Sequence, residues 1–247
     1  MNRASFGMTD VGRRRDSNED SFLDADDLGL YAVADGMGGH AAGEVASQMA
    51  IETLLQTIRD QAWTGSDPDI DEVGAALRDA IETANRKICE SVETRSEWRG
   101  MGTTMVAMAA VGPDAVIGYV GDSRAYRLRD GRMERLTSDH SWVNEQVKMG
   151  LLTDEDAQRH PMRNIVTRAL GNRVDVSVDL VRDVMQVGDV YLLCSDGLNT
   201  MLEDSEIGRL LAEHADDPRR ACEALVDSAN EQGGEDNTTV IAVRVTG

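Results

Sequence analysis

The sequence predicts an α+β fold, because segments typical of strands come in runs and segments typical of helices come in pairs. A parallel, doubly wound sheet would instead need a strict alternation of strands and helices. The strand predictions rest on short runs of apolar and β-branched residues that are bounded by turn-forming or acidic residues. These runs cover residues 29–35, 103–111, 115–122, 177–184, 189–196 and 238–245.

Helices are expected in three places around these strands. Apolar residues recur with helical spacing over residues 46–58 and again over residues 73–92, so each segment presents one apolar face to a sheet. Another helix is predicted to begin at Pro218, with Asp217 as its N-cap, and to stop at Gly233. The two long helices lie between the first and second predicted strands.

The connections predict how neighbouring strands are joined. Turn signals at residues 112–114 and 130–131 are typical of hairpins, so we expect an antiparallel meander over residues 112–136. Residues 141–172 are polar and interrupt the strand pattern, and they form either a flap beside a site or an ordinary surface connection. No internal repeat or low-complexity linker divides the chain, so residues 1–247 are expected to form a single domain.

Charge and cysteine content exclude several classes of function. The chain carries 25 Lys and Arg against 45 Asp and Glu, a net charge of −20, which repels nucleic acid and anionic membranes. Its three cysteines are widely spaced, a pattern that favours neither a disulfide framework nor a zinc knuckle. The N-terminus lacks the apolar stretch of a signal peptide, so we expect a cytoplasmic monomer with no nucleic-acid or membrane partner.

Acidic residues stand at the ends of several predicted strands. A single Asp-Gly pair is usually a turn, but carboxylates at five strand ends indicate convergence on one site. Buried carboxylates must be paired or bound to a cation, and the nearby basic residues are too few to neutralise all of them. Oxygen ligands without clustered His or Cys favour Mg²⁺ or Mn²⁺ over zinc or copper. The acids are Glu19, Asp20, Asp35, Asp122, Asp196 and Asp236.

Five ordered segments resemble the motifs of a known family. They are RRDSNEDS, VADGMGGHAAGEVAS, GYVGDSRAYRLRDG, CSDGL and GGEDNTTV, and they span nearly the whole chain. In these motifs the sequence is similar to the metal-dependent protein phosphatases (protein phosphatase 2C-like, PPM type), in their bacterial form. The resemblance implies a four-layer α-β-β-α sandwich of two mainly antiparallel sheets flanked by helix pairs. It also implies two Mn²⁺ or Mg²⁺ ions, with a third ion in bacterial members.

The resemblance assigns roles to single residues. Asp35 would bridge two metal ions, and the carbonyl oxygen of Gly36 would bind the second ion. Arg15 would hold the substrate phosphate, since its planar fork binds two phosphate oxygens at once; composition alone makes it a surface charge. The remaining assignments are Asp196 and Asp236 for the first ion, Asp122 with Asp196 for the third, Glu19 and Asp20 through metal-bound waters, and Asn237 and His40 beside the ligands.

The implied function is hydrolysis of phosphoserine and phosphothreonine by direct attack of a hydroxide that bridges the two ions. Phosphorylated proteins, including a bacterial Ser/Thr kinase and its substrates, are the expected partners. Met37 departs from the pattern, because many eukaryotic members carry at this position a histidine proposed as general acid. The proton donor is therefore unassigned: a metal-bound water is one candidate, and His40 is expected to orient the loop before the helix.

Three alternative functions have to be compared with this prediction. A cysteine phosphatase is excluded, because the segment after Cys194, SDGLNTML, holds no arginine for a C-x5-R phosphate loop. A non-catalytic module that binds phosphoproteins is disfavoured, because every proposed acid is present. Hydrolysis of a small phosphoester stays open, since the sequence does not separate it from hydrolysis of protein substrates.

Overall fold

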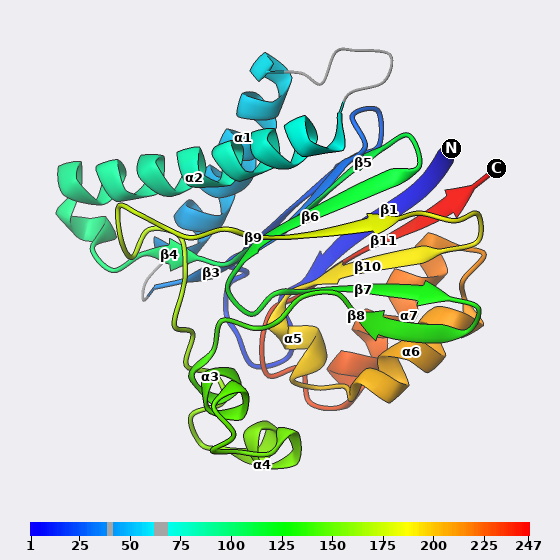
Figure 1. Ribbon diagram of the computed structural model, residues 1–247. Coiled ribbons are helices and arrows are strands. Elements are labelled where there is room, and N and C mark those ends of the chain that lie inside the picture. Colours follow the sequence, from blue (N-terminus) through cyan, green and yellow to red (C-terminus); the bar gives the residue numbers. More distant parts are fainter. Residues whose placement is uncertain (39–41, 62–68) are drawn as a thin grey trace.

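Two antiparallel sheets pack face to face between pairs of helices in the computed structural model of the protein (Figure 1). The structure describes residues 1–38, 42–61 and 69–247. Within these residues the layers follow the order helices, sheet, sheet, helices. The predicted α+β sandwich is therefore confirmed.

The first sheet brings the two ends of the chain together, since Asn2 pairs with Thr246. Its neighbouring strands are antiparallel throughout. In spatial order they are β1 (Asn2–Asp10), β11 (Thr238–Thr246), β10 (Val190–Cys194), β7 (Arg124–Arg129) and β8 (Arg132–Arg135).

The second sheet is antiparallel as well. In spatial order its strands are β2 (Asp20–Ala25), β3 (Leu30–Met37), β5 (Met105–Val111), β6 (Asp114–Val120) and β9 (Asp179–Val184). The short β4 (Gly102–Thr103) pairs with the last two residues of β3, so β3 continues past Asp35 instead of ending there.

Helices cover the outer face of each sheet. The long α1 (Ala42–Gln61) and α2 (Ile70–Thr94) pack on the second sheet, whereas α6 (Asp204–Glu213) and α7 (Pro218–Glu231) lie over the first. Asp217 caps α7 as predicted. None of the described helices is long and apolar enough to cross a membrane. The shorter helices are the 3-10 helix η1 (Ser96–Trp98), α3 (Trp142–Lys148), α4 (Asp154–Arg159) and α5 (Asp196–Asn199).

Alternation along the strands divides the core into layers, because successive side chains point to opposite faces of a sheet. On β3, Tyr31 and Val33 pack between the two sheets, while Leu30 and Ala32 pack on the side of α1 and α2. Asp35 has the same parity as Val33. The strand therefore directs the carboxylate of Asp35 toward the space between the sheets.

One predicted connection was wrong. The turns at residues 112–114 and 130–131 do join antiparallel neighbours, β5 to β6 and β7 to β8. However, β6 and β7 belong to different sheets, so residues 112–136 do not form one meander. The chain crosses between the sheets at Gly121, whose φ of 112° suits glycine, and Asp122 lies in this crossing and not at a strand end.

Residues 141–172, hereafter the flap segment, contain α3 and α4. Figure 1 shows these two helices apart from both sheets and from the helices that cover them. Each begins with a side-chain cap: Ser141 accepts a hydrogen bond from the backbone of α3, and Thr153 does the same for α4. Local capping thus defines the helices of this segment, and its role as a mobile flap stays a prediction.

The buried Asn85 of α2 fastens the chain where it returns from the flap segment. Its Nδ2 donates to the carbonyl oxygens of Arg173 and Val174 (2.9 and 2.8 Å), and its Oδ1 accepts from the backbone N–H of Gly171 (2.8 Å). All three bonds link α2 to residues 171–174, which are distant in sequence.

Replacement of Asn85 by alanine is expected to lower the free energy of unfolding by about 2–4 kcal/mol, because buried backbone groups lose their partners. Urea denaturation followed by circular dichroism measures this change. The exposed Lys87 of the same helix provides the control, since Lys87→Ala should change stability by less than about 0.5 kcal/mol. Equal effects of the two substitutions would contradict the anchoring role of Asn85.

Candidate metal centre

Strand pairing places two carboxylates opposite each other. Asp20 is the first residue of β2 and pairs directly with Asp35 of β3, so both side chains leave the same face of the sheet. This face looks toward the first sheet, as Tyr31 and Val33 show. Two like charges therefore lie side by side on the face that is covered by the first sheet.

The first sheet delivers further carboxylates. Asp196 begins α5 two residues after β10, and Asp236 lies two residues before β11, the antiparallel neighbour of β10. Gly197 allows this close approach, because a side chain at this position would clash with the carbonyl oxygen of Asn237. Neighbouring strands of one sheet thus present both acids on one side.

Burial and mutual repulsion raise the pKa values of these acids. Burial is the main cause for Asp20, whose pKa rises to about 7, and for Asp196, whose pKa rises to about 6. The pKa of Asp35 is raised well above its ordinary value by burial and then by the charges of Asp20 and Asp196. Burial and the charge of Asp196 likewise raise the pKa of Asp122. The carboxyl groups therefore interact electrostatically, and cations would stabilise their ionised forms.

The residues present fit divalent cations with oxygen ligands. Asp20 Oδ2 accepts hydrogen bonds from Ser195 Oγ (2.8 Å) and Thr239 Oγ1 (2.7 Å), whereas its Oδ1 is buried without a hydrogen-bond partner among the described residues. A carboxylate oxygen without a protein partner can be satisfied by a cation or by an ordered water. Carboxylate and carbonyl oxygens are the ligands that Mg²⁺ and Mn²⁺ prefer.

The acids are near one another but do not surround one point. Across residues 1–38, 42–61 and 69–247, no group of three or more His, Cys, Asp and Glu side chains is already arranged to hold a metal ion. Asp35 and Asp196 are nevertheless close enough for each side chain to affect the pKa of the other. Like charges this close favour the uptake of a proton or a cation, because either one reduces their repulsion.

Threonine hydroxyls fix the backbone at Asp35. Thr104 Oγ1 accepts from the N–H of Asp35 (3.1 Å), and Thr103 Oγ1 donates to its carbonyl oxygen (2.8 Å). Thr104 Oγ1 also bonds Ser123 Oγ (2.6 Å), which follows Asp122. Sequence reasoning missed these residues, as well as Ser195 and Thr239, although pairs of hydroxyl residues beside the acidic motifs are the signal for them.

Gly36 lies where three chain segments approach one another. Its N–H donates to the carbonyl oxygen of Glu19 (3.2 Å), and Ser47 Oγ donates to the same oxygen (2.6 Å). A side chain at position 36 would clash with the carbonyl oxygens of Glu19 and Gly43. Only glycine fits this position without a shift of the backbone, and the role of its carbonyl oxygen as a metal ligand stays a prediction.

Asn237 organises the loop that carries Glu19. Its Oδ1 accepts from the N–H of Glu19 (2.8 Å), and its Nδ2 donates to the carbonyl oxygens of Val11 and Ser17 (2.9 and 3.0 Å). Burial is the main cause that raises the pKa of Glu19. Asn237 thus fixes the backbone around Glu19, and its place beside metal ligands stays a prediction; His40 lies outside the described residues.

Arg15 contacts the acidic group directly. Its Nη2 lies 2.6 Å from Asp236 Oδ2, and this hydrogen bond is the main cause that raises the pKa of the guanidinium. About half of the side chain is exposed, so the guanidinium is accessible from solvent. Arg15 is therefore not an isolated surface charge. Its binding of phosphate stays a prediction.

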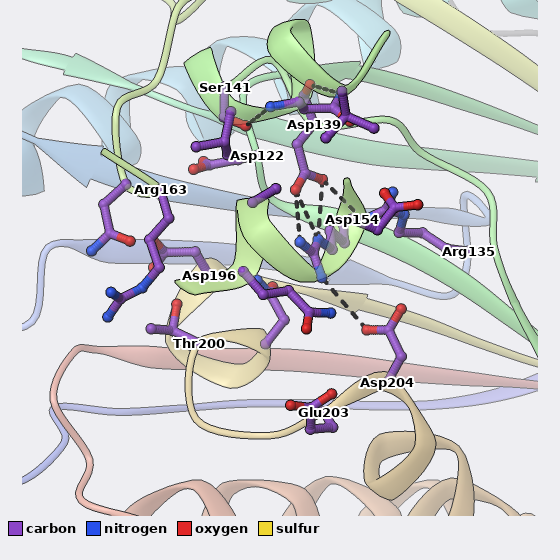
Figure 2. Close-up of a pocket in the computed structure, with 18 of the residues that line it drawn as sticks. Asp122, Arg135, Asp139, Ser141, Asp154, Arg163, Asp196, Thr200, Glu203 and Asp204 are labelled. Atoms are coloured by element: carbon purple, nitrogen blue, oxygen red, sulfur yellow. Dashed lines mark hydrogen bonds and ion pairs between the residues drawn. The ribbon is translucent and has the colours of Figure 1, made fainter. Parts of the chain in front are cut away.

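A cavity of about 240 Å³ opens beside the carboxylates, between the flap segment and the segment from α5 to α6. Figure 2 shows Asp122 and Asp196 in its lining, together with Ser141 from the flap segment and Glu203 before α6. We call this space the flap cavity. It is large enough for a few side chains, so a chain segment next to the acids could enter it.

A comparison with known protein families identifies the family of this chain. A family model described as Protein phosphatase 2C matches residues 12–233, which is most of the chain. The chain belongs to the protein phosphatase 2C family. It is therefore a phosphatase and a hydrolase, of a family whose members depend on metal ions.

Relatives of this PP2C phosphatase match along almost their whole length. The serine/threonine phosphatase stp of Listeria welshimeri is 40% identical over 240 residues, which cover 95% of this chain and 93% of the relative. The protein phosphatase PhpP of Streptococcus pneumoniae is 38% identical over 241 residues, which cover 96% of this chain and 95% of the relative.

Solved structures share the fold of this PP2C phosphatase. The serine/threonine phosphatase PstP/Ppp of Mycobacterium tuberculosis superposes with a TM-score of 0.91 at 36% identity, over 100% of both chains. The catalytic domain of PstP in complex with two manganese ions has a TM-score of 0.87 at 36% identity, over 99% of both chains. The four-layer fold and the family assignment therefore agree.

Replacement of Gly36 by alanine tests the requirement for glycine beside Asp35. Overpacking against fixed backbone costs about 1–3 kcal/mol, so Mn²⁺ affinity, measured by isothermal titration calorimetry, should fall about tenfold or more. Gly74 of α2 is the matched control, because a side chain there would make only ordinary contacts of 3.6 Å or more. Unchanged Mn²⁺ affinity in Gly36→Ala would contradict a tight ligand position.

Proposed function

We propose that this PP2C phosphatase hydrolyses phosphoserine and phosphothreonine in proteins by direct attack of an activated water on phosphorus. The observation that carries the proposal is the meeting of carboxylates from both sheets with one accessible arginine. Asp20 and Asp35 come from the second sheet, whereas Asp196 follows β10 and Asp236 precedes β11 of the first. An arginine beside several acids is the arrangement expected when cations and a phosphate bind together.

The acids and one carbonyl oxygen would hold Mn²⁺ or Mg²⁺. Asp35, Asp196 and Asp236 are the proposed direct ligands together with the carbonyl oxygen of Gly36, and Asp122 is the proposed ligand of a third ion. When bound, such ions lower the pKa of water to near neutrality and offset negative charge on phosphate. Asp20 is proposed to act by holding water, since hydroxyl groups already fix one of its oxygens.

Arg15 is proposed to bind the phosphate of the substrate. Its guanidinium pairs with Asp236, so its fork is next to the place where phosphate would meet the acids. Two parallel hydrogen bonds from the fork would orient the phosphate for in-line attack. Met37 ends β3 and offers no proton, so the leaving alkoxide is proposed to take its proton from water.

Phosphorylated proteins are the proposed substrates, among them a Ser/Thr kinase and its targets. The relatives of known name are serine/threonine phosphatases, which supports this substrate class. The flap cavity adds room for residues beside the phosphorylated side chain. A cytoplasmic monomer with a strongly acidic surface is the form we propose for the enzyme.

Release of phosphate from a phosphothreonine peptide tests the activity. The rate is expected to depend on Mn²⁺ or Mg²⁺ and to vanish with a chelator. Asp35→Asn and Asp196→Asn should each lower kcat/KM by about 100-fold or more, because each removes a ligand charge. Asp227→Asn, at an exposed position on α7, is the control and should match the wild type. Equal rates in all variants, or no activity with either metal, would exclude the proposal.

Alkylation distinguishes this chemistry from that of a cysteine phosphatase. Burial raises the pKa of Cys194 to about 12, so its thiol stays protonated at neutral pH and is hidden from reagents. Treatment with iodoacetamide at neutral pH should therefore leave the Mn²⁺-dependent rate unchanged. Loss of activity together with modification of Cys194 would point to a thiol nucleophile instead.

A further inference from the structure

Arg124 joins the two walls of the flap cavity. Its Nε and Nη2 donate to both carboxylate oxygens of Asp139, with distances of 2.7–3.2 Å, just before the flap segment begins. Its Nη1 contacts Asp204, the first residue of α6, at 3.5 Å on the other wall. The dashed lines from Asp139 and Asp204 in Figure 2 mark these contacts. The guanidinium of Arg124 therefore contacts residues of both walls of the cavity.

The pair of Arg124 and Asp139 is rigid by chemistry and by burial. Both side chains are mostly buried, with exposed fractions of 17% and 11%. A forked contact fixes the relative orientation of the two groups, which a single point contact does not. The hydroxyl of Tyr126 adds support, because it accepts from Arg124 (3.1 Å) and donates to Asp204 (2.9 Å). A connected polar network thus links the two walls of the cavity.

The start of the flap segment is also tied to the crossing that carries Asp122. The N–H of His140 donates to the carbonyl oxygen of Gly121 (2.9 Å), and the N–H of Gly121 donates to His140 Nδ1 (3.0 Å). Burial and the nearby Arg168 lower the pKa of His140, in agreement with a neutral ring that accepts at Nδ1. Its Nε2 lies 3.3 Å from Asp179.

These anchors continue into the helices of the flap segment. Asn144 of α3 donates its Nδ2 to Ser138 Oγ (3.1 Å) and to the carbonyl oxygen of Asp139. On the return path the N–H of Thr167 donates to the carbonyl oxygen of His140 (2.8 Å). A displacement of Asp139 would therefore move α3 with it.

We propose that Arg124 and Asp139 are positioning residues, which hold the flap segment at the distance from α6 that a polypeptide substrate needs. The proposal rests on the proposed phosphatase function. It assigns the pair an effect on substrates that extend into the flap cavity and no effect on small phosphoesters, which reach only the acids. Neither residue contacts the reacting atoms in this assignment.

The same strand offers a matched control pair. Arg127 and Asp183 lie 2.6 Å apart with exposed fractions of 16% and 13%, nearly those of Arg124 and Asp139. A tyrosine hydroxyl, that of Tyr191, also bonds Asp183 (2.7 Å). This pair joins β7 to β9 and takes no part in lining the flap cavity. A general effect of losing a buried ion pair on β7 would appear equally in both pairs.

The test measures two substrates with each variant under Mn²⁺ saturation. A phosphothreonine peptide with residues on both sides of the phosphothreonine occupies the cavity, and p-nitrophenyl phosphate does not. The variants are Arg124→Lys and Asp139→Asn, which keep charge or volume, with Arg127→Lys and Asp183→Asn as controls. Thermal unfolding of each variant records its stability.

We expect Arg124→Lys and Asp139→Asn to raise KM for the peptide about tenfold, since misplaced binding groups lose much of their effect. Their kcat/KM for p-nitrophenyl phosphate should stay within about twofold of the wild type. The KM of the double variant for the peptide should lie within about twofold of the higher KM of the two single variants, because the two residues act as one unit. The controls should leave both substrates unchanged.

Other outcomes overturn the proposal. Peptide KM values equal to those of the controls would show that the pair has no positioning role. Parallel losses on both substrates would place the effect at the acids instead of the cavity. A wild type without activity on either substrate would remove the proposed function itself, which is a separate result.

Hydrogen exchange of the wild type decides the question even if a variant fails to fold. The amides of His140 and Thr167, at the start and return of the flap segment, should exchange more slowly than those at its tip, residues 149–153. Exchange at the start as fast as at the tip would overturn the proposal, because an unanchored segment could not set the cavity width.

Discussion

The repulsion between buried carboxylates is the constraint on which the arrangement of this protein depends. Asp20 and Asp35 face each other through strand register, and the charge of Asp196 is close enough to raise the pKa of Asp35 further. Apolar packing on both sheets has to hold these charges together, since nothing in their own interaction favours the contact. At the proposed metal site, bound cations would reduce this repulsion between buried acids.

Neutral hydroxyl groups orient the acids without neutralising their charges. Ser195 and Thr239 bond one oxygen of Asp20 and leave the other one free, while Thr104 fixes the backbone of Asp35. A lysine or arginine in these places would offset the charge of the acids and weaken the proposed binding of cations. Hydroxyls give orientation and keep the charge, which is why they suit the surroundings of ligands for hard cations.

The sequence predicted the layer order through ordered motifs that resemble a known family, and the roles of the acids in these motifs stay a prediction. Asp35, Asp196 and Asp236 belong to such motifs. The crossing at Gly121 was missed, since a turn signal does not tell which sheet the next strand joins. The contact of Arg124 with Asp139 was also out of reach, because a pairing between separate segments depends on tertiary packing. For the same reason the sequence left the flap segment undecided.

The register between β2 and β3 limits where insertions in the sequence can be tolerated during evolution. Both acids face the other sheet only because Asp20 stands opposite Asp35, and a slip by one residue would turn one of them toward the covering helices. The turn between these strands, residues 26–29, lies outside that pairing. A length change in the turn would keep this register but disturb the bond from the N–H of Ala110 to the carbonyl oxygen of Gly29, whereas a residue gained inside either strand would separate the acids of the proposed catalytic site.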